Sequence, residues 1–465
     1  MLNTIVAGAF VLGVVVLVHE FGHFIVAKWG GVFVKTFSIG FGKKILKRRF
    51  GETVYAISIL PFGGYVKFAG ETEYYDDVDH EKEAEEAKNA GPNDEVPDSQ
   101  IPRERYFTTK PAAIRAAVLF AGPFMNYLLA VLLFIGMTWI LGGQVYPTTT
   151  VGQVSEDSAA DSVGIRAGDR FVSIDGEGVG NWGDVLTALY EDVGTVKTFV
   201  LERDGVEFEL DCAASLGEDG AHRYGVVADV PARIGRVKRG KPASEAGILE
   251  GDFIVAIDDT AMTSWDQMQQ KISSSPEIPL YVEWTHDGVT RADTIIPQAI
   301  KAIKPGTMNE FVVVGQVGLS PYMVQRREGL PTSIVQGFTT ANEMIVRIVS
   351  YLGLLFTGKM GVETLGGPIL ITQMAGDVAR WGFDYLLGFL AFFSINLCIF
   401  NLMPLLPFDG GHLALLGYEA VARRPVNRRL REIFAQAGFV LIILLMAFVI
   451  MLDINRCSGS SPGLF

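Results

Sequence analysis

Long apolar runs alternate with polar stretches along the chain, and four of these runs are long enough to cross a bilayer as helices. Between the second and third runs, apolar residues recur in short alternating segments, which is typical of strands joined by turns. The pattern predicts a polytopic α-helical membrane protein with an α+β part between its second and third transmembrane helices. The four runs cover residues 2–27, 112–141, 383–406 and 434–452.

The positions of lysine and arginine orient these four spans. Basic residues crowd the connection after the first span, around Lys43 to Arg49, and the connection between the third and fourth spans, around Arg423 to Arg431. Short loops rich in lysine and arginine stay in the cytoplasm. Because four spans put these two loops on the same side, we expect residues 143–380 and both termini on the opposite, exported side.

Composition and charge narrow the class of protein further. Hydrophobic residues make up 49% of the 465 residues, and charged residues make up 20%. The net charge of −13 is mostly local, since residues 71–98 hold twelve acidic and two basic side chains. The rest is nearly neutral, so we expect no nucleic-acid partner, and we interpret the acidic run as a solvated linker. The three cysteines are too scattered for a disulfide framework or a thiolate metal site.

A repeat at a fixed offset runs through the exported region. The pattern Gly-Ile-x-x-Gly-Asp occurs at residues 164–169 and again at 247–252, and Trp182 recurs in register as Trp265. Each first glycine would end a short helix, and each Gly-Asp pair would turn the chain into a strand. The repeat resembles two circularly permuted PDZ domains, which bind extended peptides or chain ends by strand addition. Whether these two bind peptides or only shield the membrane part stays open.

The segment His19-Glu20-Phe21-Gly22-His23 interrupts the first apolar run. Residues four apart share one face of a helix, so both imidazoles can reach one metal ion, and neutral imidazole suits zinc. Glu20 would be the general base and acid, moving a proton from a zinc-bound water, the nucleophile, to the leaving amine. Ionisable side chains at membrane depth cost at least about 2.5–3.5 kcal/mol on insertion scales, which favours a functional role.

A catalytic zinc needs a third protein ligand and one open position. Asp409 is the candidate, because it follows Pro404 and Pro407, whose interruption of the third run is tolerated in a membrane only around a protein-lined or watered cavity. We therefore expect one Zn²⁺ per chain, bound by the two histidines and Asp409. A helix cap is the alternative role of Asp409, and His412 is either a partner of a ligand or a core histidine.

These motifs together resemble the site-2 protease family of intramembrane zinc metalloproteases, whose members carry H-E-x-x-H and N-x-x-P-x-P-x-L-D-G. Asn401, Pro404 and Asp409 keep the family's spacing, whereas the second proline comes one residue late at Pro407 and Phe408 replaces the leucine. This departure concerns the local backbone and not the ligand. The resemblance covers essentially the whole chain and implies a metalloendopeptidase that performs regulated intramembrane proteolysis.

The resemblance also implies how a substrate would be held. Asn401 and Asn396 would bind the substrate backbone or the developing oxyanion, although Asn401 could instead satisfy carbonyls freed by Pro404. Residues 31–70 alternate like strands and resemble the family's re-entrant β-hairpin, whose edge would accept the unwound substrate; a plain cytoplasmic hairpin is the alternative. Within it, substrate contact is expected at Gly40, Phe41 and Gly42.

The same resemblance implies partners and a location. The substrates would be single-span membrane proteins, such as an anti-sigma factor after a prior cut by another protease, and also remnant signal peptides. The chain would lie in the bacterial inner membrane, with periplasmic PDZ domains and an active site near the cytoplasmic side. An amphipathic region at 314–380 and the PDZ pair would exclude bulky substrates. Asn126, in the family's second-span motif, is expected to serve helix packing.

Two rival functions predict other patterns. A membrane scaffold with a dead site would lack Glu20 or Asp409, and a metal transporter would string acidic or histidine residues across several spans. Both residues are present in a single constellation, so we prefer the protease. The expected parts are a first span with the zinc motif (1–30), a hairpin (31–70), an acidic cytoplasmic linker (71–107), a second span (108–142), two PDZ domains (143–230 and 231–313), an amphipathic helical region (314–380), a third span with the aspartate ligand (381–415), a cytoplasmic loop (416–433), a fourth span (434–453) and a tail (454–465).

Overall fold

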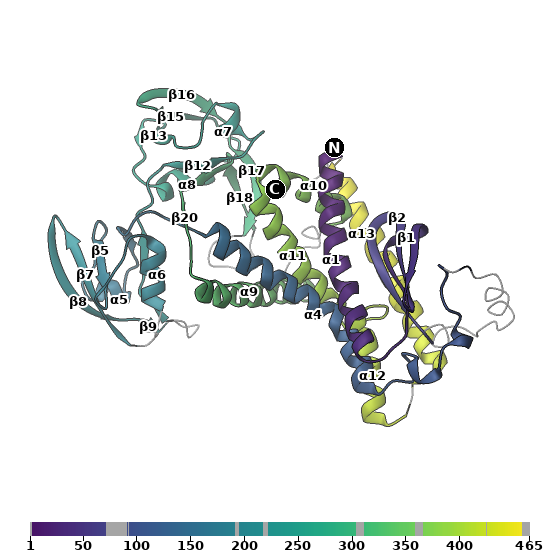
Figure 1. The fold of residues 1–465 in the computed structure, drawn as a ribbon. Helices are drawn as coiled ribbons and strands as arrows, with labels where there is room; N and C mark the ends of the chain where they lie inside the picture. The colour runs from purple at the N-terminus through teal and green to yellow at the C-terminus, as the bar shows by residue number, and fades with distance from the viewer. Residues whose placement is uncertain are drawn as a thin grey trace. The chain divides into compact units, whose positions relative to one another are not determined.

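The computed structural model describes residues 2–70, 91, 93–190, 195–216, 222–303, 311–358, 366–424 and 426–457. These residues form two compact units, drawn as a ribbon in Figure 1. The membrane unit lies within Met1–Leu141 and Glu328–Ser460, and the repeat unit lies within Gly142–Arg327. Most of the acidic run, at 71–90, and the tail from residue 458 onward lie outside the described residues.

Among the described residues, four helices of the membrane unit are long and apolar enough to cross a bilayer. They confirm the four predicted helical spans, with one correction. The prediction carries the third span through residue 415 with Asp409 on it, but that helix ends at Asn401 and Asp409 begins a separate helix, α12 (Asp409–Ala422). Pro404 and Pro407 explain the break, because proline lacks the N–H that a helix needs. The spans are α1 (Leu2–Trp29), α4 (Ala112–Gly136) with its π-helical extension η3 (Met137–Leu141), α11 (Phe383–Asn401) and α13 (Arg428–Cys457).

Two further helices complete the packing of the membrane unit. Helix α9 (Leu330–Phe356) packs with α4 and α11, and α10 (Pro368–Trp381) packs with α1 and α11, each around a small apolar core. The helical region expected from residue 314 therefore begins only at Leu330, because the preceding residues form strands. Helices α1 and α4 approach closely at Gly22, where an added Cβ would lie 2.8 Å from the Ala121 carbonyl carbon. Small residues permit such close contact of membrane helices.

The segment between α1 and α4 forms one folded sheet from β1 (Val34–Phe50) and β2 (Thr53–Phe68). Residues 34–41 lie in the middle, because Thr36 pairs with both Val54 and Lys67. The outer segments are residues 44–50, which pair with 53–58, and residues 64–68, which pair with 34–39. One face packs on α1, where the Phe24 ring lies 5.2 Å from that of Phe37. Two short 3₁₀ turns, η1 (Asp98–Gln100) and η2 (Arg103–Arg105), follow.

The repeat unit confirms the internal repeat and its register. Its two four-stranded sheets have the same strand order, β6-β5-β7-β8 and β14-β13-β15-β16, and β5 and β13 each begin directly after the Gly-Asp pair of their repeat. One apolar core runs through both repeats. The glycines that end the short helices, Gly164 and Gly247, have φ values of 85° and 83°, which favour glycine. Whether the repeats are PDZ domains stays a prediction.

The strands and helices of the repeat unit follow in chain order. In and before the first repeat they are β3 (Gly143–Val145), β4 (Val151–Val154), α5 (Ala159–Ser162), β5 (Arg170–Ile174), β6 (Glu177–Gly178), α6 (Trp182–Tyr190), β7 (Val196–Arg203), β8 (Val206–Ala213), β9 (Ser215–Leu216), β10 (His222–Arg223) and β11 (Val226–Ala228). The second has β12 (Ile234–Val237), α7 (Pro242–Glu245), β13 (Phe253–Ile257), β14 (Thr260–Ala261), α8 (Trp265–Ser273), β15 (Leu280–His286), β16 (Val289–Ile295), β17 (Gln298–Ile303), β18 (Phe311–Gln316), β19 (Leu319–Pro321) and β20 (Val324–Arg326).

Candidate metal centre

The two histidines of the first span lie on one face of α1 and are buried against α4. Nδ1 of His23 lies 2.7 Å from the Val118 carbonyl oxygen, to which it donates a hydrogen bond. A neutral imidazole that donates from Nδ1 has its lone pair on Nε2. The Nε2 atoms of His19 and His23 face each other at 3.1 Å. The helix thus presents two imidazole nitrogens to a single point.

Asp409 reaches the same point from the start of α12. Its Oδ2 lies 3.2 Å from Nε2 of His19 and 3.4 Å from Nε2 of His23. The chain turns sharply between α11 and α12, and the Leu406–Pro407 peptide bond there is cis. Two glycines permit this turn: an added Cβ at Gly410 would lie 2.5 Å from the Met403 oxygen, and one at Gly411 would lie 2.6 Å from the Leu405 carbonyl carbon. The absence of side chains at Gly410 and Gly411 therefore allows α12 to begin close to the end of α11.

The three atoms have the spacing that a zinc ion requires. Ligands bound tetrahedrally at about 2.0–2.1 Å lie about 3.3–3.4 Å from one another, and here the separations are 3.1, 3.2 and 3.4 Å. Two neutral imidazoles and one carboxylate are also a usual donor set for catalytic zinc. In the part of the chain that the structure describes, this is the one group of three such side chains close enough to share a metal ion.

Asn126 on α4 is a residue whose place the sequence did not reveal. It is fully buried, and its amide nitrogen lies 3.3 Å from Nδ1 of His19. Its Oδ1 has no hydrogen-bond partner among the described residues. A half-turn of the amide exchanges its oxygen and nitrogen, so Oδ1 can accept a hydrogen bond from His19 Nδ1–H. This hydrogen bond would orient Nε2 of His19 toward the proposed metal position. The signal in the sequence is an amide inside an apolar span, for which helix packing is the expected role.

Gly122 on α4 keeps the space beside the two imidazoles free of side chain. An added Cβ there would lie 2.6 Å from Cε1 of His23 and 2.7 Å from Cε1 of His19, closer than real side chains approach. The glycine therefore lets both rings lie directly against the backbone of α4, in a position that any larger residue would obstruct.

A cavity of about 320 Å³ opens beside these side chains. Glu20 lines it, next to the sheet: an added Cβ at Gly64 would lie 3.5 Å from Cγ of Glu20. The outer sheet segment 64–68 thus forms one wall. The other lining residues include Tyr65, Val66, Phe68, Asn401, Phe408 and His412.

The structure separates the predicted substrate-binding residues into three groups. Asn401 lines the cavity, with its amide nitrogen 3.4 Å from Nε2 of His19. Asn396 does not line it and instead donates a hydrogen bond to the Phe392 carbonyl within α11. Gly40, Phe41 and Gly42 are not among the lining residues; the Phe41 ring stacks on that of Tyr65, which does line the cavity, with centroids 6.3 Å apart.

Known proteins are similar to this chain over almost its whole length. The model of peptidase family M50 matches residues 7–445. The regulator of sigma-E protease RseP of Escherichia coli is 32% identical over 470 residues, which cover 96% of this chain and 97% of that protein. Protease RseP of Yersinia pestis is 31% identical over 469 residues, with the same coverage. A candidate zinc metalloprotease of Neisseria meningitidis is 31% identical over 478 residues, 98% of this chain and all of that protein.

The match to the family spans all four apolar helices apart from the two ends, and its range includes the positions of His19, His23 and Asp409. The alignments with the relatives from Neisseria meningitidis and Escherichia coli cover all and 97% of those proteins. The chain belongs to peptidase family M50, the site-2 protease family, and is a membrane metalloendopeptidase.

Proposed function

We propose that this protein is an intramembrane zinc endopeptidase that cuts single-span membrane proteins. The observation that carries the proposal is the triangle formed by Nε2 of His19, Nε2 of His23 and Oδ2 of Asp409, between helices long enough to span a bilayer. These residues would hold one Zn²⁺ ion, which when bound lowers the pKa of a water molecule and polarises the scissile carbonyl. The name of the Neisseria meningitidis relative, a candidate zinc metalloprotease, supports zinc as the metal.

Glu20 is the proposed general base and acid. It follows His19 on α1 and lines the cavity, so its carboxylate can receive a proton from the attacking water and deliver it to the leaving amine. Asn401 lines the same cavity and has an amide nitrogen that can donate to the developing oxyanion. Each role uses a group that lies on the cavity wall.

The sheet supports a route for the substrate. A transmembrane helix hides its carbonyl groups in internal hydrogen bonds, so it must unwind before it can be cut. Residues 64–68 are an outer segment of the sheet and also a wall of the cavity. An unwound peptide that pairs with this segment would lie along the wall beside Glu20 as an added strand. This replaces Gly40, Phe41 and Gly42 with Tyr65, Val66 and Phe68 as the proposed direct contacts.

The biological setting is proposed by likeness to the relatives. The name of the Escherichia coli relative as a regulator of sigma-E protease supports an anti-sigma factor as substrate, after a first cut by another protease. The protein would act in the bacterial inner membrane, with its repeats in the periplasm and the metal centre near the cytoplasmic side. The repeats would exclude substrates with bulky exported domains or bind chain ends.

The test is cleavage of a membrane-anchored, single-span reporter with a trimmed exported domain. The purified protein is compared with Glu20→Gln, and with Glu177→Gln as a control for the same chemical change at an exposed residue of the repeat unit. We expect the protein and the control to cut, the Glu20 variant to lose at least about 100-fold in rate, and a chelator to abolish cleavage. Equal cleavage by the Glu20 variant would refute the proposed mechanism.

A further inference from the structure

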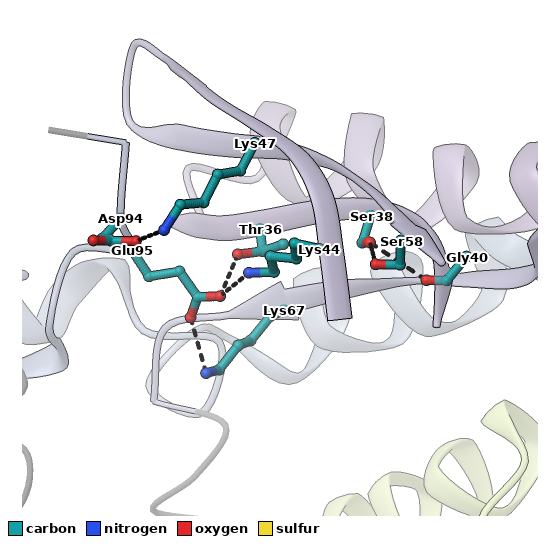
Figure 2. A network of polar contacts seen from close by, with 9 residues as sticks. All are labelled: Thr36, Ser38, Gly40, Lys44, Lys47, Ser58, Lys67, Asp94 and Glu95. Carbon is teal, nitrogen blue, oxygen red and sulfur yellow. Dashed lines mark hydrogen bonds and ion pairs between the residues drawn. The ribbon is translucent and has the colours of Figure 1, made fainter. Parts of the chain in front are cut away.

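The end of the acidic run lies against the sheet. The carboxylate of Glu95 accepts hydrogen bonds from Thr36 Oγ1 at 2.7 Å, from Lys44 Nζ at 2.8 Å and from Lys67 Nζ at 2.9 Å, as Figure 2 shows. Asp94 pairs with Lys47 beside it. A solvated linker, as expected from the charge of this run, therefore does not describe these residues. They form an acidic strap, defined here as residues 93–98.

The partners of Glu95 come from different segments of the sheet. Thr36 lies in the central segment, Lys44 begins the outer segment 44–50, and Lys67 lies in the outer segment 64–68. A single carboxylate thus joins the middle of the sheet to both of its sides. Segment 64–68 is also the cavity wall, so the hydrogen bond to Lys67 connects the acidic strap to the peptidase site.

Neighbouring contacts hold the acidic strap in place. Asn93 accepts a hydrogen bond from the Arg49 amide at 3.2 Å, and Asp98 forms an ion pair of 3.0 Å with Lys35. The side chains of Lys35 and Asp98 are only 8% and 9% exposed. Charged pairs shielded from water are screened less than exposed ones. Because Asn93 contacts segment 44–50 and Asp98 contacts Lys35, the strap crosses the sheet from that segment toward the first residues of β1.

The charge of Glu95 persists at all physiological pH values. Burial alone would raise its pKa, but the hydrogen bonds from Lys44 and Thr36 and the charge of Lys67 lower that pKa to about 2. The carboxylate consequently stays ionised and able to accept all three hydrogen bonds.

We propose that Glu95 is a positioning residue of the peptidase: by holding Lys67, it fixes segment 64–68 beside Glu20. The inference rests on the proposed function, in which this segment receives the substrate. The wall has little free space, since an added Cβ at Gly64 would lie 2.7 Å from the Ser38 oxygen and 3.5 Å from Glu20 Cγ. A displaced segment would therefore offer the peptide a poorer edge for strand pairing and weaken its binding. Glu95 itself does not line the cavity.

The first experiment compares Glu95→Gln with Asp94→Asn. Asp94 is a matched control, because it loses the same charge in the same strap, but its partner Lys47 lies in segment 44–50 and not in the cavity wall. With the single-span reporter, we expect Glu95→Gln to raise KM about tenfold, the effect of losing a hydrogen bond to a charged group. Its kcat and zinc content should stay within about twofold, and Asp94→Asn should change nothing beyond that range.

The second experiment separates the cavity wall from the rest of the sheet. Lys67→Met should reproduce the rise in KM, whereas Lys44→Met should not, and Glu95→Gln combined with Lys67→Met should be no worse than Glu95→Gln alone. Hydrogen exchange should quicken in residues 64–68 of the Glu95 variant, which reports on the wall without relying on activity.

Equal KM values for the Glu95 and Asp94 variants, or equal effects of Lys67→Met and Lys44→Met, would overturn the positioning role alone. A lower melting temperature with unchanged KM and unchanged exchange in 64–68 would do the same. If the unmodified protein does not cut, or cuts without Glu20, the proposed function fails and this inference falls with it.

Discussion

The two units of the chain surround their buried aspartates in different ways. In the repeat unit, Asp169 accepts hydrogen bonds from the Arg166 amide at 2.8 Å and from the Arg203 guanidinium at 2.6 and 2.8 Å. In the membrane unit, the contacts that the structure describes for Asp409 are the two imidazole nitrogens, at 3.2 and 3.4 Å. A turn amide and a guanidinium satisfy Asp169, whereas under the proposed function Asp409 would share a zinc ion with the two histidines. The proposal thus gives the buried carboxylate a structural role in one unit and a chemical role in the other.

The two repeats differ in the side chain that pairs with their buried aspartate. Asp252 is the counterpart of Asp169 in the second repeat and accepts a hydrogen bond from the Leu249 amide at 2.9 Å, but its side-chain partner is His286, whose Nδ1 lies 2.5 Å away. A guanidinium presents several N–H donors in a planar fork, whereas an imidazole presents one nitrogen to a given carboxylate. The same scaffold therefore holds one aspartate by two side-chain hydrogen bonds and the other by a single contact.

The largest expected effect comes from Asp409→Asn. The amide removes the negative ligand, so we expect loss of bound zinc after dialysis against a weak chelator. Cleavage of the reporter should fall by more than the roughly 10–100-fold that is typical of changes around a metal's ligands. Metal analysis and rate measurement on the same sample provide the check. Full zinc content in this variant would contradict the assignment of Asp409 as a ligand.

A smaller effect is expected from Asp169→Asn, and it should be of another kind. The change leaves Arg203 without its carboxylate, which we expect to cost the repeat unit about 1.5–3 kcal/mol of unfolding free energy. Zinc content should not change. Thermal unfolding and hydrogen exchange provide the measurements, with Asp259→Asn as a control at an exposed aspartate. A loss of zinc from Asp169→Asn would end the contrast between the two kinds of buried aspartate.

The smallest effect is expected from His286→Arg, which makes the second repeat resemble the first. We expect a gain in stability of less than about 1 kcal/mol, because a guanidinium can donate two hydrogen bonds to Asp252, as Arg203 does to Asp169, where the imidazole makes a single contact. Hydrogen exchange of β13 and β15 measures it. Exchange that is unchanged or faster would show that the second repeat gains nothing from the second donor.

The pH dependence of the first repeat follows from the pair formed by Asp169 and Arg203. Burial alone would raise the pKa of Asp169, but the hydrogen bonds from Arg203 and from the Arg166 amide hold it below its usual value. Its contribution to stability is therefore complete above the ordinary aspartate pKa of about 3.9 and is lost only as the pH falls through the lower folded value. Between pH 5 and 8 this pair should contribute a constant amount.

Much of the candidate site could be predicted because its signals are local. His19 and His23 are one helical turn apart, and Asp409 stands out because two prolines precede it in an apolar run. The acidic strap could not be predicted, because its charge density alone indicates solvation. Only the positions of Thr36, Lys44 and Lys67 on one sheet make Glu95 a tight acceptor.

The sequence by itself determined the four spans, the repeat and the candidate metal ligands, since apolar length, a fixed offset and helical spacing are properties that can be read along the chain. The tertiary structure decided which residues line the cavity. The fold of β1 and β2 places Tyr65, Val66 and Phe68 in the cavity lining with Glu20, whereas Gly40, Phe41 and Gly42 are not among the lining residues. It also brings Asn126 to His19 across 107 residues of chain. Such contacts depend on strand register and helix packing, which no local pattern specifies.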